Sequence, residues 1–188
     1  RLHCQVRCKG ILIAYIIQSG IGKGPSIDYF YNDYLSFGFE YLYDKSEITN
    51  TYDQSFGEVK YIDKEELSTN FIYANIYGGM GPYVRIGFFN RDWLIEQQLK
   101  RASDNLNLAK STANFGDNGL FLGAGWNWIW DNGFSLRIRI SSMHSEPDYE
   151  YFEENASFTE AAKESWVKEV EARAYLLTPA FISVGWMF

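Results

Sequence analysis

The segment Phe181-Ile182-Ser183-Val184-Gly185-Trp186-Met187-Phe188 carries a bulky apolar side chain on every second residue counted back from Phe188. Successive side chains of a β-strand point to opposite faces, so these apolar residues share one face. Chain termini are usually exposed and frayed. The segment therefore predicts a strand that forms part of a wall, and the residues on its apolar face are Ile182, Val184, Trp186 and Phe188.

Three upstream segments alternate in the same way, with large apolar residues on one face and small or polar residues on the other. They are Tyr34–Tyr43, Leu120–Trp130 and Phe134–Ser142, and the last places Arg137 and Arg139 on its polar face. With five weaker candidates they predict eight strands. The weaker candidates are Gly10–Ile17, Ser26–Tyr31, Ser68–Tyr77, Tyr83–Phe89 and Ala172–Phe188.

Short and long connections alternate between the eight segments. Asn32-Asp33, Gly78–Pro82 and Asp131–Gly133 are compact and consist of residues that tolerate tight turns. With an even number of strands, this alternation places the short turns and both termini at the same end of a barrel. The long polar connections are Asp44–Leu67, Asn90–Gly119 and Met143–Glu171, with a shorter one at Gly20–Pro25.

Two regions of the sequence lack the period-two alternation of the other strands. Gly10–Ile17 is continuously apolar, so it is either a buried first strand or the end of a signal sequence; without it the strand count falls to seven. We expect residues 1–9 to be an N-terminal extension or a leader remnant and residues 10–188 to form the barrel. Asp148–Glu171 predicts a short surface helix, because Phe158, Trp166 and other apolar residues recur there at helical spacing.

The composition favours a strand-rich protein. Aromatic residues make up 18% of the 188 residues, beside 16 Gly and only 4 Pro. No apolar run reaches the roughly 18 residues of a transmembrane helix, so any membrane crossing would use strands.

The net charge of −7 argues against nucleic acid as a partner. The two histidines, His3 and His144, do not combine with the cysteines in the spacing of a zinc site, so we predict no metal. The glycine-rich stretch Gly78–Gly81 lacks the Lys-Ser/Thr that follows in a phosphate-binding loop, and we predict no cofactor.

The glycine positions decide which face lies inside. The interior of an eight-stranded barrel just holds side chains. The face that carries Gly38, Gly87, Gly123 and Gly125 is therefore the interior, and the bulky opposite face meets lipid. Isolated buried ions are costly, so charged residues on the inner face must pair. This predicts an interior polar network of Asp28, Glu40, Arg85, Arg137 and Arg139, and lipid-interface aromatic residues at Tyr43, Trp126, Trp128 and Trp130.

The pattern of eight strands, alternating connections and a terminal Phe188 two residues after Trp186 resembles the small eight-stranded bacterial outer-membrane barrels of the OmpA-barrel, OmpX and OmpW type. Gly185 lies closer to the terminus than in those proteins. The resemblance implies an all-β, antiparallel, up-and-down transmembrane barrel with short periplasmic turns, longer extracellular loops and periplasmic termini. It also implies a monomer, surrounded by outer-membrane lipid and lipopolysaccharide, whose Trp186 and Phe188 are read by the barrel-assembly machinery.

The resemblance is specific for architecture and leaves three functional hypotheses. The first is a structural or surface-interaction role with a lumen plugged by ion pairs and no catalytic residue. The alternative is a narrow channel or binding site for small hydrophobic molecules, with Arg137 and Arg139 lining a path. The second alternative is a lipid A-modifying enzyme, which would depend on His144 and on Ser142, two residues before it on the same face. The acidic residues Glu146–Glu154 predict a solvated loop, or a weak cation site bridging to lipopolysaccharide.

Overall fold

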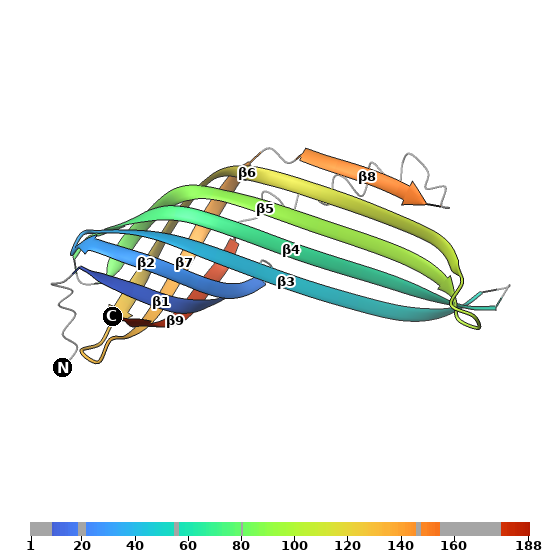
Figure 1. The fold of residues 1–188 in the computed structure, drawn as a ribbon, viewed down its shortest axis with the longest axis horizontal. Coiled ribbons are helices and arrows are strands. Elements are labelled where there is room, and N and C mark those ends of the chain that lie inside the picture. The colour runs from blue at the N-terminus through green and yellow to red at the C-terminus, as the bar shows by residue number, and fades with distance from the viewer. Residues whose placement is uncertain (1–8, 19–21, 55–56, 80, 146–147, 155–177) are drawn as a thin grey trace.

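The computed structural model describes residues 9–18, 22–54, 57–79, 81–145, 148–154 and 178–188. These residues form nine strands of one antiparallel sheet (Figure 1). No helix within this part of the chain is long and apolar enough to cross a membrane. The strands are β1 (Gly10–Gln18), β2 (Gly22–Asn32), β3 (Leu35–Gln54), β4 (Gly57–Tyr77), β5 (Pro82–Arg101), β6 (Asn107–Ile129), β7 (Phe134–Ser145), β8 (Asp148–Glu154) and β9 (Thr178–Met187).

Eight of these strands close into a ring. Pairing runs in sequence order from β1 to β7, and β9 then joins β7 to β1. The predicted eight-stranded, antiparallel, up-and-down barrel is therefore confirmed. Gly10–Ile17 lies in β1. Its alternation was hidden because both faces are apolar: Leu12, Ala14 and Ile16 are buried, whereas the residues between them are exposed on the outer face.

Both ends of the barrel chain meet at the end that carries the short turns, as Figure 1 shows. Ile11 N donates to Phe188 O at 3.0 Å, and Phe188 N donates to Ile11 O at 2.9 Å. The β2–β3 turn is held by Asn32, whose side-chain oxygen accepts from Tyr34 N at 2.8 Å. In the β6–β7 turn, Asn132 accepts from Phe134 N in the same manner at 3.1 Å. Short Asn side chains thus take the place of backbone acceptors at these turns.

Four strands continue far beyond the ring. β3, β4, β5 and β6 are 20, 21, 20 and 23 residues long, whereas a tilted strand crosses a membrane in about 9–11 residues. Their outer halves form, with β8, a sheet that we call the extension sheet (Figure 1). The prediction that Asp44–Leu67 and Asn90–Gly119 are loops was wrong. One face of this sheet carries the buried apolar residues Ile95, Ala113 and Phe115, but charged and polar residues interrupt them along each strand, so the regular alternation that reveals a strand is missing.

The helix predicted for Asp148–Glu171 is wrong in its first part, because Asp148–Glu154 forms β8. β8 pairs with Lys110–Gly116 of β6 in the same register that β7 uses with the ring part of β6. An open strand edge offers backbone partners that a seven-residue helix would have to replace. The rest of the predicted helix, residues 155–171, lies outside the described residues, as do residues 1–8 of the expected N-terminal extension.

Candidate functional site

The centre of the lumen holds the five charged residues predicted from the sequence, and the structure brings them into one alternating chain. Each is almost fully buried. Arg139 donates from Nη1 and Nη2 to the two oxygens of Glu40 at 3.0 Å each. Glu40 also accepts from Arg85 Nη1. The order, which we call the ionic chain, is Arg139, Glu40, Arg85, Asp28 and Arg137.

The other end of the ionic chain is looser. Arg85 Nη2 lies 3.9 Å from Asp28 Oδ1, and Arg137 Nη1 lies 2.9 Å from Asp28 Oδ2. Arg137 is 3% exposed, and its nitrogen atoms make no geometrically complete hydrogen bond to the described protein atoms. Because three guanidinium groups share two carboxylates, the ionic chain has a cationic residue at each end, Arg139 and Arg137. Glu40 is therefore the most heavily paired member, and Arg137 the least.

Neutral residues that the sequence analysis missed complete this layer. Asn75 donates to Asp28 Oδ1 at 2.9 Å and accepts from Arg85 Nε at 2.6 Å. The Arg85 guanidinium also stacks on Tyr73, 3.4 Å from the ring centroid, and that of Arg139 on Phe181 at 3.8 Å. A signal for Asn75 was present, since it alternates with Ile76 and shares the inner face with Tyr73.

Clusters of buried apolar side chains lie on both sides of the ionic chain. The layer toward the extension sheet contains a cluster of aromatic rings around Phe71, whose centroid lies 5.0 Å from that of Phe121 and 6.4 Å from that of Phe181. The ionic chain therefore lies between two layers of buried apolar side chains, where its charges interact strongly. The extension-side layer is Ile16, Leu42, Phe71, Tyr73, Phe89, Phe121, Met143 and Phe181, and the turn-side layer is Leu12, Ala14, Phe30, Tyr77 and Tyr83.

Interior glycines make room for the large rings. Tyr73 pairs across the sheet with Gly38 on one side and with Gly87 on the other. A Cβ at Gly38 would lie 2.5 Å from the Tyr73 ring, and one at Gly87 would lie 2.8 Å from Phe121. The glycine face is therefore the crowded inner face, because each missing side chain is replaced by a neighbour's ring.

The outer face of the ring carries three successive rows of apolar side chains across β3–β6. Beyond them lies a polar row, which we call the asparagine row, made of Tyr41, Asn70, Asn90 and Asn118. From Trp126 to Asn118 the strand covers about 27 Å, or about 20 Å along the barrel axis at a tilt near 40°. This height is close to that of a barrel's lipid-facing band. The apolar rows are Leu35, Ile76, Val84 and Ala124; Phe37, Ala74, Ile86 and Leu122; and Phe39, Ile72, Phe88 and Leu120.

The predicted interface aromatics lie at opposite ends of this band. Trp126, Trp128 and Trp130 are at the end with the short turns, whereas Tyr43 lies on the outer face next to the extension sheet. Trp186 also lies at the turn end, where its Nε1 donates to the Asn132 carbonyl at 2.9 Å. Phe188 is exposed beside the β1–β9 pairing.

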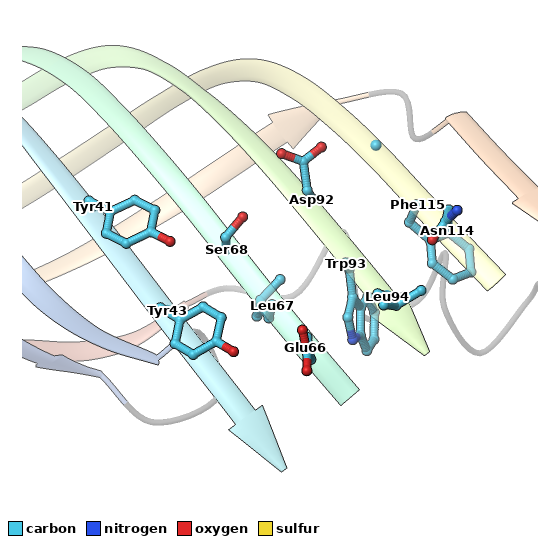
Figure 2. Close-up of a pocket in the computed structure, with 11 residues that line it drawn as sticks. Tyr41, Tyr43, Glu66, Leu67, Ser68, Asp92, Trp93, Leu94, Asn114 and Phe115 are labelled. Carbon is cyan, nitrogen blue, oxygen red and sulfur yellow. The ribbon is translucent and has the colours of Figure 1, made fainter. Parts of the chain in front are cut away.

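Just beyond the asparagine row, the outer face is hollowed by a depression of about 470 Å³, which we call the trough. Its axis is the next row of the sheet, where Tyr43, Ser68, Asp92 and Gly116 stand side by side. Figure 2 shows Tyr41 and Tyr43 on β3 at one end and Asn114 and Phe115 on β6 at the other. The full lining is Tyr41, Tyr43, Glu66, Leu67, Ser68, Asp92, Trp93, Leu94, Asn114, Phe115 and Gly116.

The floor of the trough is supported from behind. Trp93 and Phe115 pack together on the opposite face of the extension sheet, with ring centroids 5.7 Å apart, beside the buried Ile95. At the outer rim, Lys45 Nζ donates to Glu66, which raises the pKa of Lys45 and neutralises the Glu66 carboxylate. Asp92 has no such partner among the described residues. Within the described lining of the trough, Asp92 is therefore a carboxylate without a cationic partner.

His144 is exposed on the outer face of β7, two residues after Ser142. Within the described residues no hydrogen bond joins it to a serine or to a carboxylate. The same part of the chain holds no group of three His, Cys, Asp or Glu residues able to hold a metal ion. The side chains of Glu146–Glu154 lie outside the part that can be described.

Comparison with known proteins identifies the architecture. No family model and no curated protein matches the chain. Among solved structures, CarO2 of Acinetobacter baumannii superposes with a TM-score of 0.55 at 12% identity, over 96% of this chain and 99% of that one. CarO of the same organism gives 0.52 at 14% identity, over 99% of both chains. These neighbours are eight-stranded outer-membrane barrels.

The chain has the fold of an eight-stranded outer-membrane β-barrel. Ail, the attachment invasion locus protein of Yersinia pestis, is also similar, with a TM-score of 0.40 at 9% identity over 95% of this chain and 94% of that one. At these identities the likeness concerns the fold, so any function has to be argued from the residues themselves.

Proposed function

We propose that the chain is an integral protein of the bacterial outer membrane, with a closed barrel that anchors the extension sheet at the cell surface. The observation that carries the proposal is the outer face, where three rows of exposed apolar side chains end at the asparagine row. Contiguous apolar surface of this kind has no favourable place in water. On an antiparallel barrel it matches a lipid-facing band.

The filled lumen supports a structural or surface-interaction role over transport. The ionic chain and its two apolar layers occupy the interior, and opening a path would leave buried charges without partners. No observation on the described residues favours a channel for small hydrophobic molecules. A lipid A-modifying enzyme has little support either, because among the described residues neither a nucleophile nor an orienting carboxylate is hydrogen-bonded to His144.

The extension sheet supports the surface role. Its strands contribute about ten residues each beyond the membrane-crossing length, and the face that continues the outer face of the barrel carries charged and polar residues such as Lys45, Glu66 and Asp92. In this arrangement the short turns and both ends of the barrel chain lie on the periplasmic side. Trp186 and Phe188, on the last strand, would then be available to the barrel-assembly machinery from that side, and the barrel would function as a monomer.

Conductance in planar lipid bilayers tests the closed lumen. The purified protein is expected to insert without producing stepwise ion currents, because a lumen filled by the ionic chain and the two apolar layers would not conduct ions. Reproducible current steps from the wild-type protein would overturn the plugged-lumen proposal and favour a channel.

Cysteine labelling in intact cells tests the orientation. In a Cys4→Ser/Cys8→Ser background, Thr49→Cys in the extension sheet is expected to react with a membrane-impermeant maleimide. Asp131→Cys, in the β6–β7 turn, is the matched control and should react only after the outer membrane is permeabilised. The reverse pattern would invert the proposed orientation.

A further inference from the structure

We propose that the trough binds a sugar ring in the saccharide part of a membrane glycolipid that lies against the barrel. The proposal rests on the proposed outer-membrane function, because it places the extension sheet on the glycolipid side. It assigns a ligand to Tyr43, Ser68, Asp92 and Gly116, the row of residues along the axis of the trough. The height, the shape and the charge of the trough all suit such a ligand.

The height of the trough matches the saccharide layer. The trough row lies four residues beyond the last apolar row, which ends at Phe88 on β5 and Leu120 on β6. Four residues of tilted strand rise about 10 Å along the barrel axis. The polar zone on each side of a bilayer is about 5–8 Å thick. A group in the trough therefore lies at or just outside the headgroup level, on the face that neighbouring lipids touch.

The shape suits a small rigid ring. Ser68 and Gly116 flank Asp92 in the trough row, so the sheet is thin there while Tyr43 stands at one end. The volume of about 470 Å³ falls within the usual range for small-molecule sites, about 300–1,000 Å³. Figure 2 shows the Tyr41 and Tyr43 rings at one end, across β4 and β5 from Asn114. The Trp93–Phe115 contact behind the floor keeps this shape in place.

The chemistry favours a hydroxyl-rich neutral ligand over a phosphate. Tyrosine rings offer apolar faces to ring C–H groups, and their hydroxyls remain available for hydrogen bonds. The Asp92 carboxylate accepts hydrogen bonds from hydroxyls, and Ser68 and Asn114 can both donate and accept. Because Lys45 is engaged with Glu66, no free cation lines the described trough to hold a phosphate. A bare anion beside Asp92 would be repelled.

The test uses the isotope-labelled protein in detergent micelles and a soluble probe. The probe is the deacylated and dephosphorylated core oligosaccharide of rough lipopolysaccharide, titrated while backbone amide shifts are followed. The expected result is saturable shifts at Ser68, Asp92 and Gly116 and none at the short turns. Absence of shifts at these three amides would overturn the proposal.

Gly116→Val separates binding from folding. A Cβ at Gly116 meets no atom within 4 Å, and valine is a good strand residue, so the barrel should fold normally with the trough filled. Binding should fall at least tenfold. Thr112→Val, on the same face of β6 but outside the trough, is the matched control and should bind like wild type. Equal binding by Gly116→Val and the control would show that the trough is not the site.

The charge of Asp92 and the source of the ligand are tested separately. Asp92→Asn keeps the shape and is expected to weaken binding about tenfold, the usual difference for a hydrogen bond to a charged group. If only the phosphorylated oligosaccharide binds, and only with Mg²⁺, then recognition is of phosphate and the proposal fails. Because this titration needs no membrane, its outcome is independent of the labelling experiment that tests the proposed orientation.

Discussion

Arg139 and Glu40 form a two-point ion pair across the lumen, with both guanidinium Nη atoms donating to the carboxylate at 3.0 Å, although 99 residues separate them in sequence. The same carboxylate accepts from Arg85. One acidic residue thus holds two cations from β5 and β7 against β3. Its loss would leave two buried guanidinium groups with weaker partners.

We expect Glu40→Gln to lower the free energy of unfolding by about 3–5 kcal/mol, the usual cost of breaking a buried ion pair from one side. Urea unfolding in lipid vesicles, followed by tryptophan fluorescence, measures this change. Lys64→Gln is the control, since Lys64 pairs with Glu47 at 3.7 Å on the exposed extension sheet and should matter little. Similar losses in both variants would argue against a dominant role for the buried pair.

Phe88 and Phe89 are adjacent on β5 but point to opposite faces, with exposures of 66% and 3%. Phe89→Ala should cost about 3–5 kcal/mol, because it opens a cavity in the extension-side layer. Phe88→Ala should cost clearly less, since lipid chains can fill the space that its ring leaves. Vesicle unfolding of the two variants compares them directly. A larger loss for Phe88→Ala would reverse the assignment of inner and outer faces.

Gly38→Ala should destabilise the barrel by about 1–3 kcal/mol, the usual cost of overpacking. The added methyl would lie 2.5 Å from the Tyr73 ring, which is held from another side by the Arg85 guanidinium at 3.4 Å. Gly116→Ala meets no neighbour and serves as the control, with an expected effect near zero or slightly stabilising. In the double variant Gly38→Ala/Tyr73→Ala, the two effects should not add, because the clash disappears.

The extension sheet should lose stability in acid through Glu96. The hydrogen bond from Lys110, at 2.9 Å, holds the pKa of Glu96 below its ordinary value of 4.5. Because the folded-state pKa is the lower one, the stabilisation is present above about pH 4.5 and is lost as the pH falls through the folded pKa. Carboxyl carbon shifts should titrate below 4.5 in wild type and closer to it in Lys110→Gln. An unchanged midpoint in the variant would contradict the assignment.

Strict alternation made much of the fold readable from the sequence. In Phe134–Ser142 the side-chain period of two separates Arg137 and Arg139 from Ile138 and Ile140 without any knowledge of partners. Three such segments and five weaker candidates, with short turns between alternate pairs, were enough to predict the ring. Alternation failed where the contrast between faces disappeared. In β1 both faces are apolar, and in the outer half of β3 both are largely polar, so one strand was ambiguous and the other was taken for a loop.

By itself, then, the sequence determined which side chains face the lumen and which face outward, because side-chain direction along a strand follows from local backbone geometry. Only the tertiary structure decided which of them meet. The register between strands sets Glu40 between Arg85 and Arg139, and Tyr73 between two glycines. It also aligns Tyr43, Ser68, Asp92 and Gly116 from four strands into the trough. These contacts depend on pairing over long sequence distances, which no local pattern specifies.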